Sequence, residues 1–116
     1  VTCLPYDDRV EIPEGTTPII ANPDHPVLTG LGGAWPPLLG VNEVVVRERG
    51  DVEVLARLPQ DQGGHPLLVT GRFGQGRTAA WTSDIGPHWL SPAFCAWDGY
   101  GTLWKNILGW LTAGAE

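Results

Sequence analysis

The sequence predicts an α/β fold in which a block of short strands is followed by one amphipathic helix. The strands are indicated by β-branched and apolar runs that Gly- and Pro-containing turns separate. The helix is indicated by the segment from Asp98 to Leu111, where apolar residues recur at steps of three and four. Its predicted core-facing residues are Tyr100, Leu103, Trp104, Ile107, Leu108 and Leu111. At 116 residues, we expect a single domain covering residues 1–116.

Composition argues against several classes of partner. Hydrophobic residues make up 42% of the chain and charged residues 17%, which provides enough apolar material for a core. The net charge is −6 and the seven basic residues are scattered along the sequence, so we expect no nucleic-acid partner. No apolar run approaches the roughly 18 residues that a membrane span requires, so we expect no membrane insertion.

The first residues and the two cysteines indicate a fragment of a protein from a reducing compartment. The chain starts at Val1 and contains no methionine, so we expect a fragment from which an N-terminal part is missing. Its first residues have neither the basic start nor the apolar stretch of a signal peptide. Cys3 and Cys95 lie far apart without CxxC spacing, and we interpret them as buried or idle thiols in a reducing compartment, with a disulfide as the less favoured alternative.

The first third of the chain predicts an edge strand and a long connection. Residues 9–13 alternate polar and apolar side chains and close at a proline, and Glu14-Gly15 is expected to form a turn. Residues 21–33 are punctuated by prolines and are expected to run over the surface. His25 lies in this connection without further ligands at metal-binding spacing, so we expect it to be exposed or locally hydrogen-bonded.

Two hairpins are predicted in the middle of the chain. Residues 43–47 and 52–58 are rich in β-branched side chains, and the short glycine-containing turn between them predicts that they pair. Residues 66–73 and 77–82 are joined by Gly74-Gln75-Gly76 and are expected to pair in the same way. Because these glycines lie between two strands and not between a strand and a helix, we expect no phosphate-binding loop.

The predicted helix has recognisable ends, but one helix is too little for the sheet. Asp98 is expected to be the N-cap, because a carboxylate accepts the first backbone amides, and Gly114 is expected to end the helix in a left-handed conformation. Four or five short strands with only one helix leave one face of the sheet uncovered. We therefore expect the missing layer to come from another segment of the same polypeptide or from a second subunit.

Polar residues that suit a functional site follow the strand 77–82. If the next loop makes a helical turn, Asp84 and His88, four residues apart, come into contact. The carboxylate then orients an imidazole that acts as a general base. Such a base requires a nucleophile, and neither Ser91 nor Cys95 lies on a GxSxG or GxCxG pattern.

The alternative interpretation of these residues is structural. Asp84 would then cap loop amides, His88 would form hydrogen bonds within a tryptophan-rich wall, and Cys95 would fill space. Trp89 and Trp97 lie in the same loop, where large aromatic residues either close the end of a sheet or line a pocket or an interface. The residues by themselves leave both interpretations open.

Four segments of the sequence together resemble a known family. They are HPLLVTGRFGQGRTAAWTSDIGPHW, WDGYGTLWKNILGWL, NPDHPVLTGL and WPPLLGVNEV. Their order and residues resemble the C-terminal half of the class I glutamine amidotransferase-like proteins, a bacterial family of uncharacterised cytoplasmic proteins. The resemblance covers nearly the whole chain. It implies a cytoplasmic flavodoxin-like α/β sandwich, of which this chain is the strand-rich C-terminal half and from which the N-terminal βαβ portion is absent.

The same resemblance bears on catalysis. In class I amidotransferases the nucleophilic cysteine belongs to the absent half, and the C-terminal part supplies the other two triad residues as His-x-Glu. Here His88 is followed by Trp89 and Leu90, and Cys95 lies in the wrong segment to be that nucleophile. The resemblance therefore implies a domain without glutaminase activity, and we expect no metal and no cofactor.

Two functions follow as hypotheses. In the first, the domain binds a small-molecule ligand or self-associates as a homo-oligomer. The predicted binding residues are Ser83, Asp84, His88, Trp89 and Trp97. In the second, the protein is a hydrolase or amidotransferase whose nucleophile lies in the missing N-terminal half, with His88 as general base and Asp84 as the residue that orients it.

Overall fold

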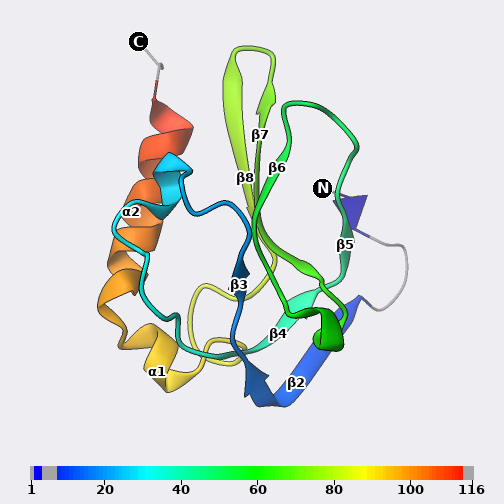
Figure 1. The fold of residues 1–116 in the computed structure, drawn as a ribbon, viewed down its shortest axis with the longest axis vertical. Helices are drawn as coiled ribbons and strands as arrows, with labels where there is room; N and C mark the ends of the chain where they lie inside the picture. Colours follow the sequence, from blue (N-terminus) through cyan, green and yellow to red (C-terminus); the bar gives the residue numbers. More distant parts are fainter. Residues whose placement is uncertain (1, 4–7, 114–116) are drawn as a thin grey trace.

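The computed structural model describes residues 2–3 and 8–113, and its central element is a four-stranded antiparallel sheet (Figure 1). The strand order is β3-β6-β7-β8. The strands are β3 (Ile19–Ile20), β6 (Glu53–Arg57), β7 (Pro66–Phe73) and β8 (Gly76–Trp81). Pairing of β7 with β8 runs from Leu68 opposite Trp81 to Phe73 opposite Gly76. The domain thus combines helices with antiparallel sheets.

Two further antiparallel strand pairs accompany this sheet. They are β2 (Arg9–Thr16) with β4 (Leu38–Asn42), and β1 (Thr2–Cys3) with β5 (Val44–Val45). β2 is longer than the predicted strand 9–13, and its register shifts between Glu11 and Thr16. The proline at position 13 therefore lies where regular pairing is interrupted and its missing N–H is tolerated. The predicted turn at Glu14-Gly15 is wrong, because both residues belong to this irregular strand.

One long helix covers a side of the sheet. The helical elements of the described residues are η1 (Pro26–Leu28), η2 (Gln60–Gln62), α1 (Pro92–Cys95) and α2 (Asp98–Thr112), where η marks a 3-10 turn. α2 runs beside η1 and packs against β8 (Figure 1). The predicted amphipathic helix is confirmed by the burial of Leu103 and Ile107, although Leu108 and Leu111 of its predicted apolar face are exposed. None of these helices has the length and apolar character to cross a membrane.

The predicted N-cap of α2 is wrong by one residue. Trp97 is the N-cap, with φ −69° and ψ 136°, and Asp98 lies in the first turn. There its carboxylate still interacts favourably with the positive end of the helix dipole. The C-cap is Ala113, and the predicted helix stop at Gly114 lies outside the described residues.

One predicted hairpin is confirmed and the other is wrong. Residues 66–73 and 77–82 pair as β7 and β8, close to the predicted bounds. Residues 43–47 and 52–58 do not pair with each other, because β5 pairs with β1 and β6 lies between β3 and β7. The tight turn at 49–51 is present, but it does not join paired strands. Strand propensity marks a segment as extended, whereas the choice of its partner depends on packing against distant segments.

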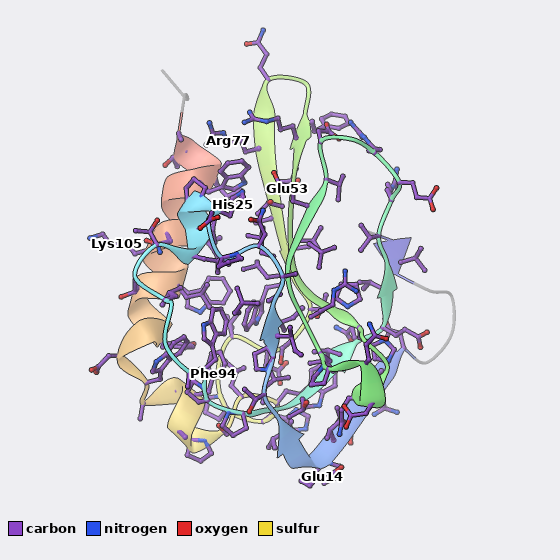
Figure 2. The ribbon with its side chains drawn as sticks, in the orientation of Figure 1. Glu14, His25, Glu53, Arg77, Phe94 and Lys105 are labelled. Carbon is purple, nitrogen blue, oxygen red and sulfur yellow. The ribbon has the colours of Figure 1, made fainter. Side chains whose placement is uncertain are left out.

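The core is built around one aromatic ring. Phe94 is fully buried, and the rings of Trp35, Trp81, Trp97 and Tyr100 have centroids 5.4 to 6.3 Å from it (Figure 2). Aliphatic residues of the strands complete the core and include Leu38, Leu55, Leu67 and Leu68. The predicted packing role of Trp35 is confirmed, since it is only 5% exposed.

His25 is buried, which contradicts the surface position expected for its segment. It is 6% exposed, and its ring lies edge-on to Trp110 with 4.7 Å between the centroids. Its Nδ1 accepts the Val27 N–H at 3.1 Å, so the neutral ring carries its proton on Nε2, 3.4 Å from Thr70 Oγ1. The expected local hydrogen bond is therefore present. The prolines suggested a surface connection, but Val27 and Leu28 enter the core and bring His25 with them.

The buried His25 predicts a stability that falls in mild acid. Burial lowers its pKa below the ordinary 6.5; the Glu53 carboxylate opposes this shift and the Arg77 guanidinium adds to it. As the pH falls through about 6.5, the unfolded chain binds the proton before the folded chain does. We therefore expect the free energy of unfolding, measured with urea at several pH values, to fall below about pH 6.5 and level off once the folded state is also protonated.

A matched variant isolates this effect. His25→Asn keeps a side-chain acceptor for the Val27 N–H but does not titrate near neutral pH. His65 and His88 are present in both proteins, so the difference between the two pH profiles reports His25 alone. The prediction would be contradicted if the free energies of unfolding of the two proteins differed by a constant amount from about pH 5 to 8.

Candidate functional site

The loop that follows β8, residues 83–90, is held against β4. Ser83 Oγ donates to the Gly40 carbonyl at 2.7 Å, and the Leu39 N–H donates to the Trp89 carbonyl at 2.6 Å. These bonds fix both ends of the loop. The strand β4 that holds them was not predicted from the sequence.

Asp84 binds two N–H groups of this loop. Its Oδ2 lies 3.2 Å from His88 Nδ1 and accepts the Trp89 N–H at 3.0 Å, while its backbone carbonyl accepts Trp81 Nε1–H at 2.7 Å. The predicted contact between Asp84 and His88 is therefore present, and Asp84 also caps a loop amide. Because a carboxylate only accepts hydrogen bonds, His88 Nδ1 carries a proton, and Nε2 of the neutral ring is unprotonated.

His88 has an unusual backbone conformation and an exposed side chain. Its φ is 104°, in the left-handed region that residues other than glycine rarely adopt. Such a conformation costs on the order of 1–3 kcal/mol and is concentrated at active sites and ligand sites. The side chain is 73% exposed, and its ring stacks on Trp89 with 5.8 Å between centroids and 27° between planes. Asp84 and Trp89 thus fix an imidazole that remains open to solvent.

Trp89 lies beneath this imidazole. It is 7% exposed, and a Cβ added to Gly40 would lie 2.5 Å from its Nε1. In the same loop, Ile85 is 71% exposed, and its carbonyl accepts a hydrogen bond from the Tyr100 hydroxyl, which ties the loop to α2. The loop therefore presents an exposed imidazole and an exposed aliphatic side chain on a fixed base.

Comparisons with known proteins identify the family. The profile of a family described as "Putative glutamine amidotransferase" matches residues 1–113. The chain belongs to this family. Two solved structures from Salmonella typhimurium are similar to it: the cytoplasmic protein STM3548, with 40% identity and a TM-score of 0.85, and the cytoplasmic protein STM1381 of strain LT2, with 38% identity and a TM-score of 0.85. Each comparison covers 96% of this chain and 42% of the other, so this chain spans less than half the length of these relatives. No curated protein matches the sequence.

Other candidate residues of this glutamine amidotransferase-like chain have structural contacts. The Trp97 ring packs 5.1 Å from Trp35 and 5.4 Å from Phe94, measured between centroids. Ser91 Oγ accepts the Phe94 N–H at 3.1 Å and caps α1, and Cys95 is a free thiol packed against the core. In the part of the chain that the structure describes, none of these three side chains shares a hydrogen bond or ring contact with the exposed imidazole. Nor do those residues include a cluster of three or more side chains suited to a metal ion.

Sequence reasoning missed three residues that hold this amidotransferase-like loop. Trp81 bonds the Asp84 carbonyl, Tyr100 bonds the Ile85 carbonyl, and Gly40 makes room for the indole beneath the imidazole. Only Gly40 has a sequence signal, because a glycine inside an apolar run often marks the close approach of another group. Of the two aromatic residues, Tyr100 was predicted to face the core because of its helical spacing, and Trp81 was predicted only as part of the strand 77–82. The hydroxyl and the indole N–H of these residues bind the loop.

Proposed function

We propose that this chain forms the ligand-binding part of a cytoplasmic glutamine amidotransferase-like protein, with loop 83–90 as the binding site and without glutaminase activity. The observation that carries the proposal is the 3.2 Å contact between Asp84 and His88, made by an imidazole that is 73% exposed. With Nδ1 bonded to the carboxylate, Nε2 is available to accept a hydrogen bond from a ligand.

Three features of the loop support ligand binding. The left-handed backbone at His88 is a strained conformation of the kind found at ligand sites. The exposed Ile85 gives the same loop an apolar side chain in addition to the polar one, a combination typical of small-molecule sites. Trp89 fixes the imidazole before a ligand arrives, which reduces the entropy cost of binding.

We also propose that the other wall of this site comes from a larger, flavodoxin-like sandwich. The region similar to this chain is 42% of each solved relative, so more than half of each relative lies outside the matched region. Within the described residues β8 pairs with no strand other than β7, although its Thr78 carbonyl accepts the Trp110 Nε1–H, and the end of β8 near loop 83–90 is available to a further strand. A strand added there would run beside β8 toward loop 83–90. Alternatively, a second copy of this chain in a homo-oligomer supplies the other wall of the site.

The second candidate function is catalysis with His88 as general base. The observation in its favour is again the orientation, since a carboxylate-oriented imidazole with unprotonated Nε2 is suited to take a proton from a nucleophile. That nucleophile would lie outside the described residues, because Ser91 caps α1 and Cys95 packs against the core. The leucine two residues after His88, where amidotransferases of class I have glutamate, disfavours glutamine as the substrate.

His88→Gly is expected to abolish ligand binding while the chain stays folded. Glycine adopts a φ of 104° without strain, so this variant removes the imidazole but keeps the backbone. Compounds that raise the melting temperature of the parent protein in a thermal-shift screen should not stabilise His88→Gly. Asp84→Asn should weaken the binding of the same compounds about tenfold, because a neutral amide holds the Nδ1 proton less strongly than a carboxylate and can itself donate to Nδ1. Two-bond proton–nitrogen NMR spectra would show the tautomer directly.

Activity assays separate the two candidate functions. Ammonia release from L-glutamine and hydrolysis of p-nitrophenyl acetate would be measured on the protein at its native length, with the same two variants. We expect neither activity in any of them. An activity that the parent protein has and His88→Gly lacks would establish the catalytic function instead. If neither a compound nor an activity depends on His88, the Asp84 contacts serve only to shape the loop, and the proposal is wrong.

A further inference from the structure

Positive charge gathers around Trp110 on α2. Arg77 Cζ lies 4.2 Å and Arg72 Cζ lies 5.4 Å from the centroid of the indole ring. The two arginines are directly opposite each other in the pairing of β7 with β8. Like charges at opposed positions of antiparallel strands repel each other, and the attraction of both to the face of an indole offsets part of that repulsion. Folding thus brings together two cations that are separated in the sequence of an acidic chain.

Trp110 is a fixed platform for these cations. Its Nε1–H donates to the Thr78 carbonyl at 3.1 Å, and the edge of His25 lies against its ring. The indole is therefore held by α2, β8 and the residue that caps η1. A guanidinium that rests on this ring has a position set by the fold.

A cavity of about 410 Å³ lies beside this platform, lined by residues of η1, β8 and the C-terminal half of α2. Arg77, Asn106, Gly109 and Trp110 are among its lining residues. Lys105 also lines it, but its side chain extends away from the sheet, whereas Arg77 lies on the sheet side (Figure 2). Arg77 is therefore the cation that a ligand would meet on the sheet side of this cavity, and the volume suits a small molecule.

The local charge balance favours an anion. Among the described residues, no carboxylate lines the cavity, and neither Arg72 nor Arg77 has an ion-pair partner. Glu53 acts on the neighbouring His25, and its carboxylate accepts Asn22 Nδ2–H at 2.5 Å. The nearby carboxylate is therefore already hydrogen-bonded to an amide and forms no ion pair with either guanidinium. The C-terminal end of α2 repels anions, so an anion is expected against Arg77 and not against the helix end.

We propose that this cavity binds a small ligand bearing an oxyanion, either a carboxylate or a phosphate, with Arg77 as the principal cation. Arg72 does not line the cavity, but it adds positive charge beside the same indole. A guanidinium presents parallel N–H donors that match either group. The wall opposite is rigid, because Asn106 Nδ2 donates to the carbonyls of Val27 and Thr29 at 2.9 and 2.8 Å. The site is separate from loop 83–90, since Arg77 lies near the start of β8 and the loop follows its end.

NMR titration tests the proposal on the ring itself. The nitrogen-15-labelled chain is titrated with sodium phosphate and, separately, with sodium succinate, while sodium chloride keeps the ionic strength constant. The Trp110 indole N–H, assigned with Trp110→Phe, is expected to shift saturably with at least one of the two salts. A response to phosphate alone identifies a phosphate site, and a response to succinate alone identifies a carboxylate site. Arg77→Gln should weaken the binding about tenfold, and Arg47→Gln, with the same change of charge, should not.

Two glycines of α2 provide a steric control. Nothing lies within 4 Å of a Cβ added to Gly101 or to Gly109, and only Gly109 lines the cavity. We expect Gly109→Leu to fill the cavity and abolish the saturable shift, while Gly101→Leu retains it. No saturable shift with either salt would overturn the proposal. The proposal would also be overturned if both Arg77→Gln and Gly109→Leu bound the salt with the affinity of the parent protein.

Discussion

Phe94→Ala is expected to lower the free energy of unfolding by about 3–5 kcal/mol, the largest effect of any single substitution considered for this chain. The ring is fully buried and contacts four other aromatic rings, which come from α2 and its N-cap, from β8 and from the segment that precedes β4. Its removal leaves a cavity between elements that other contacts hold apart. Domains of this size are typically stable by only about 5–15 kcal/mol, so the variant should unfold at a much lower urea concentration.

The chain offers a matched control, because it contains only one other phenylalanine. Phe73 is 77% exposed at the end of β7, and Phe73→Ala is expected to change the stability by no more than about 0.5 kcal/mol. Both variants lose the same atoms, so the difference between their urea midpoints reports how much the burial of the Phe94 ring contributes to stability. Equal midpoints would mean that Phe94 does not occupy the centre of the core.

Local sequence patterns predicted the elements whose partners are close in the chain. The hairpin of β7 and β8 needs only a two-residue turn, and its partner strand is the next segment. α2 follows from apolar spacing in one continuous stretch. By contrast, the predicted pairing of 43–47 with 52–58 failed because the true neighbours of β6 include β3, more than 30 residues earlier. Local propensity contains no information about such a distant partner.

One contact of the candidate site was predicted from the sequence, but the support of the site was not. The spacing of Asp84 and His88 predicted their contact through a helical turn; the structure contains the contact, but loop 83–90 has no helical turn. The left-handed backbone of His88 could not be predicted, because it arises where loop 83–90 is bonded to β4 and not from the histidine itself. β4 was missed for a physical reason. It follows two prolines and has Gly40 in its middle, and both features lower the propensity for a strand.

Gly40→Ala is expected to destabilise the chain by about 1–3 kcal/mol and to displace the candidate site at the same time. The new Cβ would lie 2.5 Å from Trp89 Nε1, closer than two such atoms can approach. The indole cannot simply rotate away, because His88 stacks on it and the Trp89 backbone is bonded to both Leu39 and Asp84. The strain should therefore pass to loop 83–90, and the NMR signals of the His88 ring should shift although the substitution lies on β4.

Gly101→Ala is the control that separates this effect from the general replacement of a glycine. Gly101 lies in α2, and a Cβ added to it would have no neighbour within 4 Å. Alanine there should stabilise the helix by about 0.5–1 kcal/mol and leave the His88 signals unchanged. A Gly40→Ala variant with parental stability and parental His88 signals would mean that Trp89 does not rest on β4. The exposed imidazole would then lack the fixed base on which its proposed ligand-binding role depends.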